Sequence, residues 1–241
     1  MALLEAHAIS KSFRGLKAVA NAGFEVPAGA IVGLIGPNGA GKTTCFNMIA
    51  GVFAPDSGEI IFDGRRIERL RPDQICAAGI GRTFQIVKPF AGLSVLDNVI
   101  VGAFNRTSRL DEARKTATGI LDRLGLGPKR DLPASSLTLP DRKRLEVARA
   151  LATRPKLLLL DEVMAGLRPT ECDLMVDIFR ELNAKDGLTI LLIEHVMRAV
   201  MALAQNIVVL HHGEIIARGT PLEVVRDPAV LECYLGEDTE V

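Results

Sequence analysis

The residues of this sequence that point most directly to chemistry are the eight at 36–43, which read Gly-Pro-Asn-Gly-Ala-Gly-Lys-Thr. They match Gly-x-x-x-x-Gly-Lys-Ser/Thr, the pattern of a phosphate-binding loop. The glycines let backbone N–H groups converge on phosphate oxygens, at the positive end of the helix expected to follow. Lys42 would neutralise charge on the β- and γ-phosphates, and Thr43 would be a ligand of Mg²⁺.

The alternative for this segment is a glycine-rich turn with a solvated lysine. We favour the phosphate-binding loop because the segment follows a short apolar run, typical of a buried strand, and opens a helical pattern. The residues expected to contact the phosphates or the metal are Gly36, Asn38, Gly39, Ala40, Gly41, Lys42, Thr43 and Thr44.

Two acidic residues, Asp161 and Glu162, follow the run of four leucines at 157–160. A buried strand that ends in Asp places a carboxylate at the carboxyl edge of a parallel sheet, where ligands of such sheets bind. Asp161 would hold Mg²⁺ through its water, and Glu162 would orient or deprotonate the attacking water. The alternative, an ordinary strand exit with exposed acids, weakens once the phosphate-binding loop is considered together with this pair.

Composition excludes several classes of protein. The 241 residues contain 29 Lys+Arg and 29 Asp+Glu, so no overall basic charge exists to hold a nucleic acid. Aromatic residues are 4%, with one Tyr and no Trp, which argues against stacking on single strands. The sequence contains no run of about 20 apolar residues, so no membrane-spanning helix is predicted. The four cysteines are far apart, which argues against a zinc site or a disulfide framework and fits a reducing cytoplasm.

Strand patterns dominate the first part of the chain, and strand and helix patterns alternate after residue 154, which predicts an α/β fold with a parallel sheet and right-handed crossovers. Strands are expected at 3–9, 19–26, 30–35, 59–64, 79–85, 157–160, 188–193, 207–210 and 214–217. Helices are expected at 41–50, 95–104, 110–124, 141–151, 170–184, 195–203 and 221–226. The purely helical stretch in the middle looks like an insertion into the sheet domain.

In this order, the elements and motifs resemble the ATPase subunit of an ABC transporter over essentially the whole chain. The resemblance implies that Phe13 stacks on adenine and that Gln85 links Mg²⁺ and water to the helical part. It places the D-loop at residues 165–169 and a switch histidine that senses the γ-phosphate at His195. The spacing of the whole set carries the inference, because Phe13 or His195 alone would be an ordinary structural residue.

The same resemblance implies a P-loop NTPase (RecA-like) core with a parallel sheet, an N-terminal antiparallel β part and an inserted helical subdomain. We expect one domain over 1–241, with the core at 1–88 and 155–241 and the insertion at 89–154. The implied cofactors are ATP and Mg²⁺. The implied partners are a second ABC ATPase subunit in a hetero- or homodimer, two transmembrane permeases and, indirectly, a periplasmic binding protein. The implied location is peripheral, at the cytoplasmic face of the inner membrane.

The signature motif of that family, Leu-Ser-Gly-Gly-Gln, is replaced here by Leu-Thr-Leu-Pro-Asp at residues 137–141. Thr138 keeps a hydroxyl that would contact ATP and suits the cap of a helix. Pro140 has no N–H to donate to a phosphate. Asp141 is expected to repel a nearby γ-phosphate. Because this motif acts on ATP held by the opposing subunit, we expect the partner's site to be weakened.

Several stretches are most similar to the LivG-type ATPases of branched-chain amino acid import, including 81–90, 161–170 and the chain end from Gly219. An apolar segment around Phe90, with Ile86 and Val87, is expected to dock a short helix of a permease. Arg168 stands where such chains usually carry Asn. Two alternatives remain: the ATPase of a lipopolysaccharide-export system, and a non-transport ABC protein that uses ATP as a conformational clamp.

Overall fold

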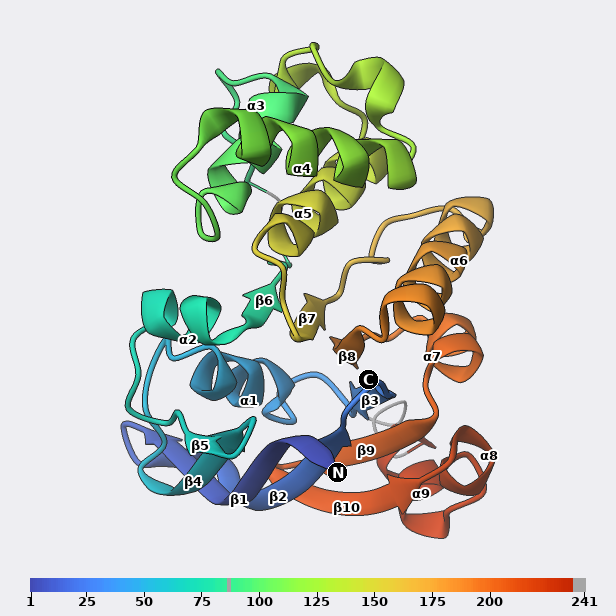
Figure 1. Cartoon of the computed structure of the whole chain (residues 1–241). Helices are drawn as coiled ribbons and strands as arrows, with labels where there is room; N and C mark the ends of the chain where they lie inside the picture. The colour runs from blue at the N-terminus through green and yellow to red at the C-terminus, as the bar shows by residue number, and fades with distance from the viewer. Residues whose placement is uncertain (86–87, 236–241) are drawn as a thin grey trace.

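Two β-sheets and a group of helices make up the chain in a computed structural model that describes residues 1–85 and 88–235 (Figure 1). The larger sheet has the strand order β10-β9-β3-β8-β7-β6 and is parallel except at β10. Its strands are β3 (Ile31–Ile35), β6 (Ile80–Arg82), β7 (Leu157–Asp161), β8 (Thr189–Ile193), β9 (Asn206–His211) and β10 (Glu214–Gly219). The predicted α/β class and parallel sheet are confirmed.

The smaller sheet is antiparallel and has the order β2-β1-β4-β5. Its strands are β1 (Ala2–Phe13), β2 (Leu16–Pro27), β4 (Ser57–Phe62) and β5 (Arg65–Arg66). It contains the predicted N-terminal strands and lies at the opposite end of the molecule from helices α3 and α4 (Figure 1).

Nine α-helices and two 3₁₀ turns occur in the part of the chain that the structure describes. The α-helices are α1 (Lys42–Ile49), α2 (Pro72–Ala78), α3 (Val95–Ala103), α4 (Leu110–Arg123), α5 (Leu139–Ala152), α6 (Pro169–Asp186), α7 (Met197–Leu203), α8 (Pro221–Val224) and α9 (Pro228–Leu235). The 3₁₀ turns are η1 (Gly127–Lys129) and η2 (Ala134–Ser136). Helices α2 and α9 and strand β5 were not predicted. Within the described ranges, no helix combines the length and the apolar character needed to cross a bilayer.

The parallel strands are buried on both faces, which explains why they read as continuous apolar runs. In β7, Leu158 and Leu160 belong to the core that also contains α3–α6, whereas Leu157 and Leu159 belong to the core between the two sheets. Strand β7 therefore packs against both cores through alternate residues and ends at Asp161, which is 1% exposed.

Helices α3, α4 and α5 pack on one another and lie together above β6 and β7 (Figure 1). This group occupies the region where the sequence predicts an insertion, although its limits at residues 89 and 154 stay a prediction. Helix α5 connects directly to β7, so it brings side chains of the helical group to the carboxyl edge of the sheet.

Candidate functional site

The phosphate-binding loop connects β3 to α1, and its glycines are required by backbone conformation and, at two positions, also by space. Gly36, Gly39 and Gly41 have φ values of 147°, 78° and 105°, in a region that other residues rarely adopt. A Cβ atom on Gly36 would lie 1.9 Å from the carbonyl oxygen of Leu210, and one on Gly41 would lie 2.3 Å from that of Ala18. The loop backbone is thus fixed between β9 and the antiparallel sheet.

Lys42 points back into this loop. Its Nζ atom donates hydrogen bonds to the carbonyl oxygens of Gly36 (2.6 Å) and Pro37 (2.7 Å), and the residue is 7% exposed. Asn38 and Thr43 are exposed at the loop surface. The arrangement holds a positive charge inside a curved run of backbone at the N-terminus of α1, which favours binding of an anion.

Asp161 faces the loop from the end of β7. Its Oδ2 atom accepts a hydrogen bond from Nη2 of Arg82 at 2.9 Å, and its backbone N–H donates to the hydroxyl of Thr83 at 3.1 Å. Arg82 also donates to Oδ1 of Asn47 at 2.6 Å. The Oδ1 atom of Asp161 is buried and has no hydrogen-bond partner. An orphaned carboxylate oxygen of this kind fits a cation or a water bound to one.

Thr43, Gln85 and Asp161 line one cavity of about 470 Å³, together with Arg82 and Glu146. In the described residues, no group of three or more His, Cys, Asp or Glu side chains could hold a metal by itself. This donor set suits Mg²⁺, which is bound through one or two protein oxygens and completes its coordination with water and phosphate oxygens.

The carboxylate of Glu162 is the point where three loops meet. Gln85, after β6, donates a short hydrogen bond from Nε2 to Oε2 of Glu162. His195, after β8, places Nε2 3.5 Å from the same oxygen. Glu162 itself has φ 49°, and its N–H donates to the carbonyl oxygen of Ile193 at 2.9 Å. A left-handed glutamate is strained, and such strain is typical of residues held in place for a function.

A protein-family profile described as "ABC transporter" matches residues 19–165, which include the loop, Gln85 and both acids. The chain belongs to the ABC transporter family. A second profile, described as "Branched-chain amino acid ATP-binding cassette transporter", matches residues 214–240. The protein is therefore an ABC-type ATPase subunit, as the sequence predicted.

Full-length relatives support the same assignment. The branched-chain amino acid transport ATP-binding protein LivG of Salmonella typhimurium is 39% identical, with 98% of each chain covered. The lipopolysaccharide export ATP-binding protein LptB of Acidithiobacillus ferridurans is 35% identical, with 99% of each chain covered. An ATP-binding cassette of an ABC transporter, MJ1267, solved in its ADP conformation, superposes with a TM-score of 0.89 at 32% identity over 98% of this chain and 99% of its own.

Lys143 is a residue of this ABC ATPase that the sequence did not single out. Its Nζ atom, on α5, donates to the carbonyl oxygens of Glu162 (3.0 Å) and Gln85 (3.4 Å), and the residue is 4% exposed. Burial lowers the pKa of Lys143, and the charges of Glu194 and Glu162 oppose that effect. The sequence signal that could have identified Lys143 is its position on the face of the helix that is buried. Lys143 connects the signature helix to two residues of the predicted site.

Glu194, next to His195, was not predicted either. It is 2% exposed, and its Oε1 atom accepts a hydrogen bond from the backbone N–H of Met164 at 2.8 Å. Its Oε2 atom is buried without a hydrogen-bond partner. Burial raises the pKa of Glu194 to about 7, despite the N–H of Met164 and the charge of Lys143, which lower it.

The structure places Asp141 between two cations of its own chain, and its expected effect on a phosphate held by a partner stays a prediction. Asp141 is 2% exposed and forms close ion pairs with Lys129 and Arg144. Thr138 caps α5 by position, but its hydroxyl donates to Oδ2 of Asp141 at 2.9 Å and accepts no bond from the helix backbone. Burial would raise the pKa of Asp141, but Lys129, Thr138 and Arg144 together hold it below its usual value.

Two other predicted positions, Phe13 and Arg168, have partners of their own. Phe13 is 44% exposed and packs edge-on against Phe53, with ring centroids 5.2 Å apart, so it is not a core residue. Arg168 is paired with Glu171 of its own helix, at 2.6 Å. The predicted docking residues Ile86 and Val87 lie outside the described residues.

Proposed function

We propose that this ABC ATPase binds ATP with Mg²⁺ at the 36–43 loop and that Glu162 is its catalytic base. The observation that carries the proposal is the clamping of Glu162 between Gln85 and His195, beside the cavity lined by Thr43 and Asp161. A carboxylate that is hydrogen-bonded by one loop and flanked by a side chain of another has a defined direction, which a base needs to meet an attacking water.

In this proposal the loop amides and Lys42 bind the phosphates, and Phe13 stacks on the adenine. Thr43 and Asp161 would hold Mg²⁺, with Gln85 close by, and the cation would supply charge neutralisation on the β- and γ-phosphates. Glu162 orients the water that attacks the γ-phosphate and accepts its proton at Oε2. His195 shares that oxygen, which lets it sense the γ-phosphate, and Lys143 keeps the backbones of Glu162 and Gln85 together.

The test uses two variants that separate chemistry from binding. Glu162→Gln keeps shape and removes the base, so turnover should fall by about 10²-fold or more while ATP affinity stays near normal. Lys42→Ala removes charge that faces the phosphates, so it should weaken nucleotide binding itself. Nucleotide titration and an ATPase assay on both proteins give the answer. Near-normal turnover of Glu162→Gln would contradict the assignment of Glu162 as the catalytic base.

We further propose that hydrolysis powers import of branched-chain amino acids by a complex of two ATPase subunits and two permeases at the cytoplasmic face of the inner membrane. A periplasmic binding protein would deliver the solute. The profile match at 214–240 favours this over lipopolysaccharide export. Copurification of the permeases, followed by ATP-dependent leucine uptake in proteoliposomes with the binding protein, tests it. A complex that hydrolyses ATP but moves no branched-chain amino acid would contradict the assignment of the solute.

The permease would dock beside the Gln85 loop. A hollow of about 270 Å³ there is lined by Val52, Phe84 and Val101, among other residues, and these three side chains are 55%, 55% and 46% exposed. Phe90 is 45% exposed, and the guanidinium of Arg149 lies 4.8 Å from its ring centroid. Cysteines at the exposed positions 88 and 91 should crosslink to a permease in membranes, whereas a cysteine at exposed Lys185 should not.

A further inference from the structure

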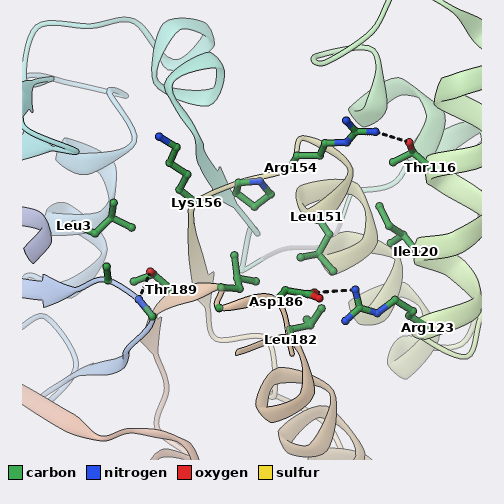
Figure 2. Close-up of a pocket in the computed structure, with 15 residues that line it drawn as sticks. Leu3, Thr116, Ile120, Arg123, Leu151, Arg154, Lys156, Leu182, Asp186 and Thr189 are labelled. Atoms are coloured by element: carbon green, nitrogen blue, oxygen red, sulfur yellow. Dashed lines mark hydrogen bonds and ion pairs between the residues drawn. The ribbon is translucent and has the colours of Figure 1, made fainter. Parts of the chain in front are cut away.

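A hollow lies at the other edge of the parallel sheet, between the helical group and the two sheets (Figure 2). It has a volume of about 550 Å³, within the range of small-molecule sites. Lys156 precedes β7, and Leu188 precedes β8, which starts at Thr189, so this hollow lies at the amino ends of these strands. Asp161 and Ile193 lie at their carboxyl ends. About 16 Å of strand therefore separates it from the nucleotide site.

The walls of this hollow are apolar and come from distant parts of the chain. Its main apolar lining residues are Leu3, Ile120, Leu151, Pro155, Leu182 and Leu188. Polar groups of the lining already have partners: the hydroxyl of Thr189 accepts from the N–H of Gly29 at 2.8 Å, and the carbonyl oxygen of Leu188 accepts from Nδ2 of Asn183 at 2.8 Å. None of the buried unpartnered side-chain atoms of the described residues belongs to its lining. An apolar group would therefore displace water without breaking a hydrogen bond.

The rim of the hollow is cationic. Arg123, Arg154 and Lys156 line it, against one carboxylate, Asp186. Arg123 pairs with Asp186 at 2.8 Å across the hollow (Figure 2), and Lys156 pairs with Asp63 outside it. These pairs are exposed and contribute little.

Arg154 differs from the other two cations. It donates to the hydroxyl of Thr116 at 3.1 Å (Figure 2), and among the described residues it has no ion-pair partner. Its φ of 46° is a strained value for an arginine. The guanidinium of Arg154 is thus held at the rim by a neutral partner and keeps donors for an anion.

We propose that this hollow binds a small carboxylate with an apolar body. The acyl or alkyl part lies against Ile120, Leu151 and Leu182, and the carboxylate pairs with Arg154. A ligand in this position touches α4, α5 and α6 at once, so it links the helical group to the sheet domain from the side opposite the nucleotide.

The test compares three probes that share a tail and differ in the head group: octanoate, octan-1-ol and octylammonium, each below its micelle or solubility limit. Isothermal titration of the full chain should show octanoate binding at least about 10-fold more tightly than either of the others, because a charged hydrogen bond is lost in both. Octanoate should also raise the melting temperature, because a ligand that binds the folded state stabilises it.

Two variants and one matched control locate the site. Arg154→Gln should weaken octanoate binding about 10-fold and leave octan-1-ol unchanged. Ile120→Trp fills the hollow and should abolish binding of both. Arg114→Gln removes an equal charge from an exposed position of α4 outside the lining and should change nothing. The readout is octanoate affinity, so it does not depend on the proposed ATPase mechanism.

Equal affinity for octanoate and octylammonium, or equal losses in Arg154→Gln and Arg114→Gln, would overturn the proposal. So would the absence of saturable octanoate binding. If Ile120→Trp does not fold, the comparison of Arg154→Gln with Arg114→Gln still decides the outcome, because both positions are exposed.

Discussion

The buried carboxyl of Glu194 should make the stability of the folded protein depend on pH. Its pKa is raised from 4.5 to about 7, mainly by burial. Between these two values the folded chain binds a proton at this position that the unfolded chain has lost. Stability should therefore fall as pH rises from about 4.5 to about 7 and then level off.

The size of the effect follows from the two pKa values of Glu194. Between about pH 5 and pH 8 the contribution of this one group changes by about 2.5 kcal/mol. For a chain of this length that corresponds to a shift in melting temperature of about 5–10 °C. Glu194→Gln can still accept the bond from the N–H of Met164 and has no proton to lose, so it should lack this part of the pH dependence.

Urea unfolding gives the free energy of unfolding of the wild type and of Glu194→Gln at pH 5 and pH 8. The change between the two pH values is then compared between the two proteins, so that the contributions of all other titrating groups cancel. Glu214→Gln, an exposed glutamate, is the matched control and should behave as the wild type. Parallel pH dependence of the wild type and Glu194→Gln would show that Glu194 is ionised in the fold. Its charge would then be balanced by Lys143.

Three further predictions concern single residues. Lys143→Met should lower ATP turnover about 10-fold or more, because the backbone carbonyl groups of Gln85 and Glu162 lose their common donor. Nucleotide affinity should stay nearly unchanged, and Lys143→Arg should keep part of the activity. Asp141→Asn should cost about 2 kcal/mol in urea unfolding, since it leaves Lys129 and Arg144 without their carboxylate; unchanged stability would contradict the pairing. Burial raises the pKa of Cys45 to about 12, so iodoacetamide at pH 8 should not modify it, whereas the partly exposed Cys76 should react. Peptide mass mapping can show the difference.

The elements that the sequence predicted correctly are those with a strong local pattern. The parallel strands are apolar on both faces, so β3, β7 and β8 were found within one or two residues. Helix α2 was missed although Pro72, at its start, was a usable signal, because its seven residues bury only Ile75 and show no periodic face.

The residues whose contacts the sequence did not predict are those whose partners come from elsewhere in the chain. The sequence places Asp141 at a helix start but does not reveal its ion pair with Lys129, from η1. Lys143 bonds to carbonyl groups 19 and 58 residues away, a contact that no local pattern encodes. The loop from Gly36 to Thr43 was the opposite case, since its glycine spacing is a local pattern that identifies it in the sequence.

The alternation of leucines along β7 makes this strand a spacer of fixed length. Inserting or deleting one residue between Leu157 and Asp161 would exchange the side chains between the two cores and move the acidic end by about 3.3 Å. Natural variants should therefore change length in the surface loops on either side, such as the turn around Arg154, and keep β7 at five residues. The same reasoning makes β7 a poor place for a tag or a split site in protein engineering.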